Sequence, residues 1–222
     1  LLPYDDQTNM AQLGIYSASY KLSILMVLFI QAFRYAGEPF FFSYAKERDA
    51  RQVYARVLTA FVVLCVFIFL LVTLYLDLFQ YFIGAAYREG LSVVPVLLLA
   101  NLLLGIYVNL SIWYKLTDRT LLGAGVALIG AGITVALLWL LVPRFGYEGA
   151  AWAHLACYGA MVVISYGLGR RYYPVPYEVP RVLGWPVLGL MLYVAARSLT
   201  EDLGWPPLVA GTLLLVLYLA LA

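Results

Sequence analysis

The sequence predicts an all-α protein, a polytopic transmembrane bundle of about seven helices. It is 64% hydrophobic and only 12% charged, whereas soluble domains are about half apolar and a quarter charged. Several uninterrupted apolar segments reach about 20 residues, the length that crosses roughly 30 Å of hydrocarbon. These runs are long and continuous, unlike the short alternating strands of a membrane barrel.

The apolar runs and the polar loops between them define the expected helices. Short polar stretches such as "KERDAR" and "LTDRT" separate the runs. We expect helices at about residues 11–44, 51–77, 91–115, 119–142, 147–169, 181–199 and 205–222. The first is the longest, so it should extend past the membrane, and Pro39 should permit a bend there.

The longest proline-rich connector, "RRYYPVPYEVPR", suggests a division of the chain. We expect a transmembrane lobe over residues 1–172 and two additional helices over residues 173–222. The chain begins without a methionine and stops inside an apolar run. We therefore interpret it as a piece of a longer protein.

Basic residues near the helix ends predict the orientation, because cytoplasmic loops carry an excess of Lys and Arg. Three basic residues, Arg88, Arg144 and Arg197, fall in one set of loops. The alternate set holds nine: Lys46, Arg48, Arg51, Arg56, Lys115, Arg119, Arg170, Arg171 and Arg181. The loops after the first, third and fifth helices should therefore face the cytoplasm.

A polar stripe follows one side of the first helix. At about 100° per residue, this side carries Ser17, Lys21, Gln31, Arg34 and Glu38, with Ser23 at its edge. A Lys or Arg near mid-membrane costs about 2.5–3.5 kcal/mol even on the lenient insertion scale. The stripe should therefore face a bundle interior or a water-filled cavity rather than lipid.

The stripe has more than one interpretation. Arg34 and Glu38 are four residues apart and can form an ion pair on the helix, with both side chains reaching the interface. That structural pair leaves Lys21 without a partner. Alternatively, the cations line a cavity for an anionic substrate, or they contact segments that this chain lacks. The sequence leaves these alternatives open.

Other chemistry has little support in the sequence. It shows no Ser–His–Asp set, no H-E-x-x-H, no phosphate loop and no carboxylate cluster, so we expect no enzyme, no cofactor and no metal. The basic residues are scattered over short loops, which argues against nucleic-acid binding. His154, Cys65 and Cys157 are interpreted as packing residues.

Three segments resemble one transporter family. "LGIYSASYKLSILM" (13–26) resembles the start of the eighth helix in O-antigen (Wzx-type) flippases of lipid-linked oligosaccharides. "VVPVLLLANLLLGIYVNLSIWYKLTDRT" (93–120) is similar to the tenth helix and its cytoplasmic loop. "VPRFGYEGAAWAHLACYG" (142–159) is similar to the Pro, Gly, Gly-Ala-Ala turn between the eleventh and twelfth helices. This family belongs to the multidrug/oligosaccharidyl-lipid/polysaccharide exporter superfamily.

The resemblance implies a fold and a function. The first five helices would be the eighth to twelfth of the C-terminal lobe, and the last two the thirteenth and fourteenth. The chain would be a multi-pass protein of the bacterial inner membrane, working with a missing N-terminal lobe of the same protein and in contact with membrane lipid. The expected substrate is a polyprenyl-pyrophosphate-linked oligosaccharide repeat unit for surface polysaccharide and lipopolysaccharide biosynthesis.

The residues expected at the site lie on the first helix. Arg34 is the first candidate for a pyrophosphate contact because a guanidinium matches phosphate bidentately, and Lys21 is the second. Gln31 and Ser23 are candidates for hydrogen bonds to sugar or phosphate, and Glu38 for an ion pair with Arg34 that opens in one state. Alternatives are a multidrug or cation antiporter of the same superfamily, and a membrane saccharide polymerase or ligase.

Overall fold

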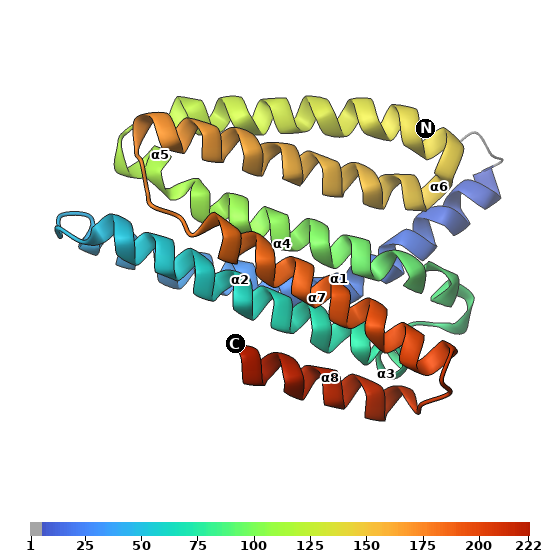
Figure 1. Cartoon of the computed structure of the whole chain (residues 1–222). Coiled ribbons are helices and arrows are strands. Elements are labelled where there is room, and N and C mark those ends of the chain that lie inside the picture. The colour runs from blue at the N-terminus through green and yellow to red at the C-terminus, as the bar shows by residue number, and fades with distance from the viewer. Residues whose placement is uncertain (1–5) are drawn as a thin grey trace.

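The computed structural model describes residues 6–222, and within that range every regular element is a helix (Figure 1). The elements are α1 (Asp6–Tyr44), α2 (Ala50–Leu74), α3 (Leu76–Phe79), η1 (Gln80–Phe82), η2 (Ala85–Val93), α4 (Val94–Leu110), α5 (Ile112–Leu116), α6 (Thr120–Tyr172), α7 (Val179–Glu201) and α8 (Pro207–Leu221). Because α6 contains two helices, the described chain has seven long ones: α1, α2, α4, the two arms of α6, α7 and α8. The expected all-α bundle of about seven helices is confirmed.

The two arms of α6 form a hairpin around Gly146. This residue has φ 55° and ψ −136°, outside the helical region, in a conformation that glycine adopts readily and L side chains rarely do. Residues 120–145 and 147–172 consequently run antiparallel, side by side (Figure 1). The expectation of two helices separated near Pro143 and Gly146 is confirmed.

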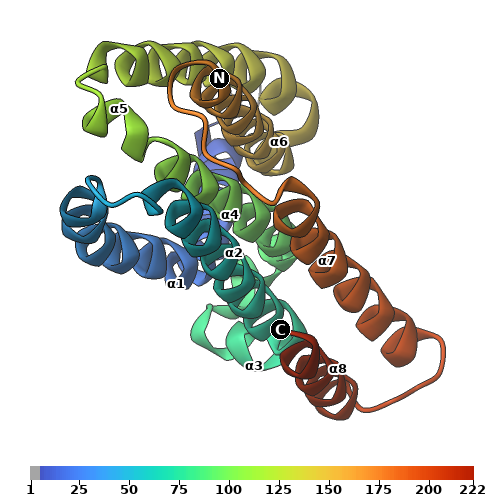
Figure 2. The same ribbon diagram turned by 60° about the vertical axis from the view of Figure 1, so that its left-hand side comes forward.

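Helix α2 lies at the centre of the core. Its Val62, Cys65 and Leu70 are completely buried, and α1, α4, α7 and α8 pack around it (Figure 2). The α6 hairpin packs chiefly on α4. Helix α8 is attached to α2 by Tyr218, whose hydroxyl donates a hydrogen bond to the carbonyl oxygen of Val63 in α2 at 2.7 Å. Cys65 and Cys157 are both free and buried, as expected of packing residues.

Five stretches of the described chain are long and apolar enough to cross a membrane. They are residues 9–44, 50–74, 85–116, 120–172 and 179–201, and the fourth contains both arms of the hairpin. Helix α8 is equally apolar but has 15 residues, fewer than the roughly 20 that a bilayer requires. The expected span at 205–222 is therefore shorter than predicted. The division between residues 1–172 and 173–222 stays a prediction.

Helix α1 is the longest unbroken helix of the described chain. Its 39 residues correspond to about 58 Å at roughly 1.5 Å per residue, well beyond the hydrocarbon thickness. The helix begins at Asp6 rather than near residue 11 and continues through Pro39 to Tyr44. It is the longest, as expected, and the bend at Pro39 stays a prediction.

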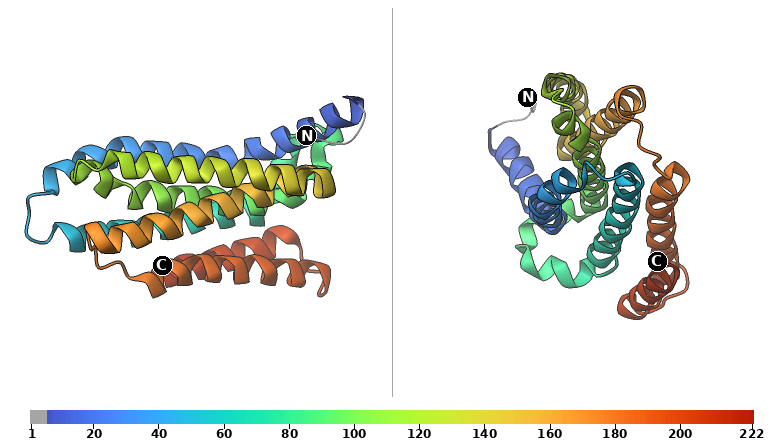
Figure 3. Two further views of the ribbon diagram at one scale, coloured as in Figure 1. Left: turned by 90° about the horizontal axis from the view of Figure 1, so that it is seen from above. Right: turned by 90° about the vertical axis from the view of Figure 1, so that its left-hand side faces the viewer.

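The three most basic loops lie at one end of the bundle (Figures 1 and 3). The guanidinium of Arg51 lies 4.8 Å from the ring centre of Tyr173, and that of Arg119 lies 4.4 Å from the ring centre of Tyr172. These contacts join the beginnings of α2 and α6 to the end of α6. The expectation that these loops share a side is confirmed, and the assignment of that side to the cytoplasm stays a prediction.

The connection between α2 and α4 differs from the expected one. Helix α2 ends at Leu74 rather than near residue 77. The elements α3, η1 and η2 occupy most of residues 76–93, which include the loop expected at 78–90. This connection packs on α1, where Ser19 Oγ donates to the carbonyl oxygen of Gly90 at 2.8 Å. A turn at Ser111 also separates α4 from α5 within the expected helix 91–115.

Candidate functional site

The polar face of α1 is open in the described bundle. Ser17, Lys21, Gln31 and Arg34 are exposed, and Glu38 is half-buried. The opposite face packs into the core through Leu22, Met26 and Ile30, each at most 7% exposed. Leu22, Met26 and Ile30 thus attach α1 to the core, while its polar face stays exposed together with the apolar Leu25 and Leu28.

Towards the basic end of the bundle, two cations share one carboxylate oxygen. Glu38 Oε1 accepts from Arg34 Nε at 3.2 Å and from Lys115 Nζ at 2.5 Å. The side chains of Arg34, Glu38 and Lys115 are 46%, 33% and 41% exposed. The expected pair between Arg34 and Glu38 is present, but the full cluster has two positive charges and one negative charge.

Lys115 is a member of this cluster that the sequence interpretation missed. It lies near the end of α5, and the sequence interpretation counted it only among the basic loop residues. Phe41 of α1 and Ile112 of α5 belong to one buried cluster with Tyr54 of α2, which brings the end of α5 beside α1. A long-range contact of this kind has no local sequence signal.

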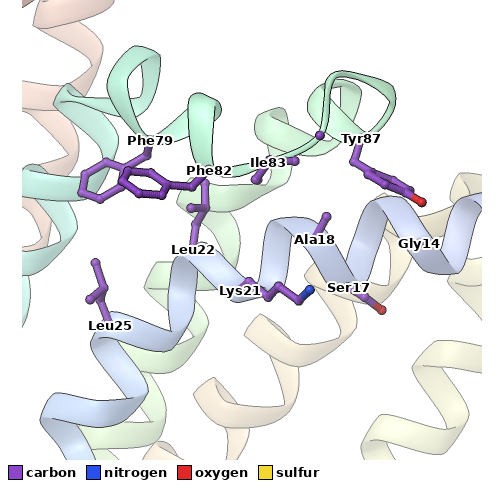
Figure 4. Close-up of a pocket in the computed structure, with 11 residues that line it drawn as sticks. Gly14, Ser17, Ala18, Lys21, Leu22, Leu25, Phe79, Phe82, Ile83 and Tyr87 are labelled. Atoms are coloured by element: carbon purple, nitrogen blue, oxygen red, sulfur yellow. The ribbon is translucent and has the colours of Figure 1, made fainter.

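At the other end of α1, the polar face borders a groove of about 570 Å³ (Figure 4). Its α1 side consists of Gly14, Ser17, Ala18, Lys21, Leu22 and Leu25. Its opposite wall comes from the α3–η2 connection and consists of Phe79, Phe82, Ile83, Gly84 and Tyr87. Among the residues the structure describes, Lys21 makes no hydrogen bond or ion pair, and its ammonium points along α1 towards Ser17 (Figure 4).

Gly14 permits the close approach of the aromatic wall to α1. A Cβ atom at this position would lie 2.9 Å from Cε1 of Tyr87, closer than carbon atoms pack. The Tyr87 ring therefore lies directly against the helix, and the groove has a defined end. The sequence interpretation also missed this wall, because it treated residues 85–90 as a loop.

The remaining two candidates, Gln31 and Ser23, differ in exposure. Gln31 is exposed on the polar face, near Arg34 along the helix. Ser23 is completely buried, and its hydroxyl donates to the carbonyl oxygen of Tyr20 at 2.7 Å. The structure therefore places Ser23 away from the polar face, in contrast to its expected role in binding sugar or phosphate.

His154 has partners within the bundle. Its Nδ1 lies 2.9 Å from the carbonyl oxygen of Ala150 and 3.3 Å from the hydroxyl of Tyr16. Within the described residues, no group of three or more His, Cys, Asp or Glu side chains could hold a metal ion.

Comparisons of the chain with protein-family models, with curated proteins and with solved structures found no match in any of the three.

Proposed function

We propose that the chain is part of a flippase that moves a polyprenyl-pyrophosphate-linked oligosaccharide repeat unit across the bacterial inner membrane for surface polysaccharide biosynthesis. The observation that carries the proposal is the exposure of Lys21 and Arg34 on the polar face of α1, a helix that is long and apolar enough to cross a membrane. They lie 13 positions apart in the sequence, or about 20 Å along the axis at roughly 1.5 Å per residue. They provide positive charge at two depths of the bundle.

Desolvation explains why such a face suits an anionic lipid. Lys21 is unpaired, and Arg34 shares a single carboxylate with Lys115. An unpaired Lys or Arg facing hydrocarbon is costly, so a face with this excess of positive charge requires water or an anionic ligand. A pyrophosphate provides several acceptor oxygens, and the planar guanidinium of Arg34 matches two of them. In this proposal the polar face of α1 lines a groove against an N-terminal lobe, and the polyprenyl tail stays in lipid.

Glu38 has a distinct role in this account. It supplies the anion that Arg34 and Lys115 share when no substrate is bound. A pyrophosphate entering from the basic end takes over both cations and displaces the carboxylate. Substrate binding then loosens the contact between α1 and α5.

The alternative functions fit this geometry less well. A multidrug or cation antiporter needs an available carboxylate, whereas Glu38 is shared by two cations. The basic character of the polar face also repels cationic drugs. A saccharide polymerase or ligase needs a set of catalytic residues, and no such set is observed among the described residues.

Substitution of Arg34 in the chain as the cell makes it tests the proposal. We expect Arg34→Ala to abolish surface glycan export at near-normal protein abundance, and Arg34→Lys to retain part of it because the charge survives. Arg197→Ala is the matched control, because Arg197 also pairs with a glutamate four residues later, at the other end of the bundle. Normal export by Arg34→Ala, or a loss of export that merely follows loss of protein, contradicts the proposal.

A further inference from the structure

Two arginines share one tyrosine ring at the basic end of the bundle. The guanidinium carbon of Arg119, immediately before α6, lies 4.4 Å from the ring centre of Tyr172. That of Arg171, in the last turn of α6, lies 5.6 Å from the same centre. The Tyr172 ring also stacks on that of Trp113 in α5, which is only 2% exposed. A buried side chain thus holds the ring, and the ring holds the two cations close together.

Neither arginine has an acidic partner to offset this arrangement. The ion pairs within the described residues all involve other basic side chains, and neither Arg119 nor Arg171 donates a side-chain hydrogen bond to a described residue. The aromatic ring attracts each guanidinium but carries no net charge. The two guanidinium carbons are at most about 10 Å apart, a distance over which like charges still repel at moderate salt. An anion that accepts hydrogen bonds from both relieves this repulsion.

An exposed apolar stripe begins beside these cations and follows the first arm of α6. Its residues Leu121, Leu128 and Val135 are 87%, 73% and 68% exposed. They are spaced seven positions apart, which places them on one face because seven residues complete nearly two helical turns. The stripe covers about 21 Å at roughly 1.5 Å per residue, more than half of the roughly 30 Å hydrocarbon thickness. Positive charge at the end of an apolar stripe of this length matches the shape of a phospholipid.

We propose that Arg119 and Arg171 bind the phosphate of an anionic phospholipid whose acyl chains lie along the stripe of Leu121, Leu128 and Val135. The phosphodiester has two unesterified oxygens, and a guanidinium pairs with such oxygens bidentately. Basic groups at the ends of transmembrane helices recognise anionic headgroups through this chemistry. A zwitterionic lipid fits less well, because its ammonium approaches two cations. The inference goes beyond the proposed function and does not depend on it.

The location gives the lipid a structural effect. Arg119 and Arg171 lie at the open end of the α6 hairpin, opposite the turn at Gly146 (Figure 1). A phosphate bound by both arginines joins the two arms at the end where no turn connects them. Because the lipid binds the folded hairpin, it should also stabilise the protein against unfolding.

Native mass spectrometry of the purified protein, as the cell makes it, tests the site. The probes are phosphatidylglycerol and phosphatidylcholine with the same acyl chains, mixed in equal amounts. The wild type should bind phosphatidylglycerol about tenfold more often, and Arg119→Gln with Arg171→Gln should remove most of this preference. Arg48→Gln with Arg56→Gln is the matched control, because these arginines are also exposed near the basic end but contact no ring. The control should keep the preference.

Further measurements assign the individual groups. Arg119→Lys with Arg171→Lys should retain part of the preference, because the charge survives without the bidentate geometry. Tyr172→Leu should reduce the preference, since both charges stay but the ring that positions them is lost. An excess of inorganic phosphate should not displace phosphatidylglycerol, because free phosphate lacks the acyl chains. Phosphatidylglycerol should raise the thermal midpoint of the wild type more than that of the double glutamine variant.

Each contrary outcome overturns a defined part of the inference. Equal binding of the two lipids by the wild type, or an unchanged preference in the double glutamine variant, means that the arginines only hold the ends of α6 together. An equal loss in the Arg48 and Arg56 control means that general surface charge attracts the lipid. Displacement by inorganic phosphate means that the site takes free anions. If the double glutamine variant does not fold, a full preference in folded Tyr172→Leu contradicts the site, and a reduced one supports it.

Discussion

Glu38 of α1 and Lys115 of α5 lie 77 residues apart in the sequence and form an ion pair, with 2.5 Å between Oε1 and Nζ. The same carboxylate oxygen accepts a hydrogen bond from Arg34 Nε at 3.2 Å. One acid therefore restrains two cations and ties α1 to α5 at the basic end of the bundle. This arrangement makes Glu38 a competitor of any anion that approaches from that end.

Removing the charge of Glu38 should strengthen anion binding. Glu38→Gln frees Arg34 and Lys115, so inorganic pyrophosphate should bind roughly fivefold more tightly, since two half-exposed pairs are worth about 1 kcal/mol in total. Calorimetric titration of the purified protein measures this affinity. Glu201→Gln, which breaks the pair with Arg197 at the other end, is the control and should have no effect. Weaker or unchanged binding in Glu38→Gln would show that the carboxylate does not compete with the anion.

The hairpin of α6 should depend on glycine at position 146. Gly146→Ala forces an L side chain to φ 55° and brings a Cβ to 2.8 Å from Gln12 Oε1. We expect a loss of about 1–3 kcal/mol in stability, seen as a lower thermal midpoint in detergent. Gly132→Ala in the same hairpin has no atom within 4 Å of its Cβ and should be neutral or slightly stabilising. Equal midpoints for the two variants would contradict the role of Gly146.

The attachment of α8 to α2 should be sensitive to one hydroxyl. Tyr218→Phe removes the donor to the carbonyl oxygen of Val63 from a side chain that is completely buried. The expected cost is about 1 kcal/mol, measured as a lower midpoint of thermal unfolding. Tyr81→Phe is a suitable control because Tyr81 is 74% exposed. If both variants melt like the wild type, this hydrogen bond does not contribute to docking of α8.

Labelling of introduced cysteines tests the orientation. Cysteines at Asp49, Asp118 and Tyr173 should be protected from an impermeant maleimide added to intact cells, whereas cysteines at Glu148 and Asp202 should react. The native Cys65 and Cys157 are buried and should contribute little signal. Efficient labelling of any of the first three positions would reverse the assigned topology.

The sequence predicted the helices well because their signals are local. Long apolar runs marked the helices, and Pro143 with Gly146 marked the hairpin turn of α6. The periodicity of α1 predicted its polar face, and Ser17, Lys21, Gln31 and Arg34 on that face are exposed. The excess of basic residues correctly placed three loops at one end.

The parts of the candidate site that the sequence did not predict depend on long-range packing. Lys115 reaches Glu38 only because α5 packs beside α1, and the aromatic wall reaches Lys21 only because the α3–η2 connection folds over α1. Helical periodicity does not decide whether a residue at the edge of a polar stripe, such as Ser23, is exposed or buried. Its hydroxyl is satisfied by the carbonyl oxygen of Tyr20, so it can be buried in the core at little cost.

The central claim is that the cations of α1 carry an anionic lipid across the membrane. Its most direct test uses proteoliposomes that contain the chain as the cell makes it and a fluorescently labelled polyprenyl-pyrophosphoryl-N-acetylglucosamine. Dithionite, which does not cross the bilayer, quenches only the label in the outer leaflet. We predict that the wild type and Arg197→Ala let nearly all of the label be quenched, whereas Arg34→Ala leaves the inner-leaflet share protected, as in empty vesicles. Equal quenching by Arg34→Ala and the wild type, or full protection of the inner leaflet with the wild type, would contradict the account.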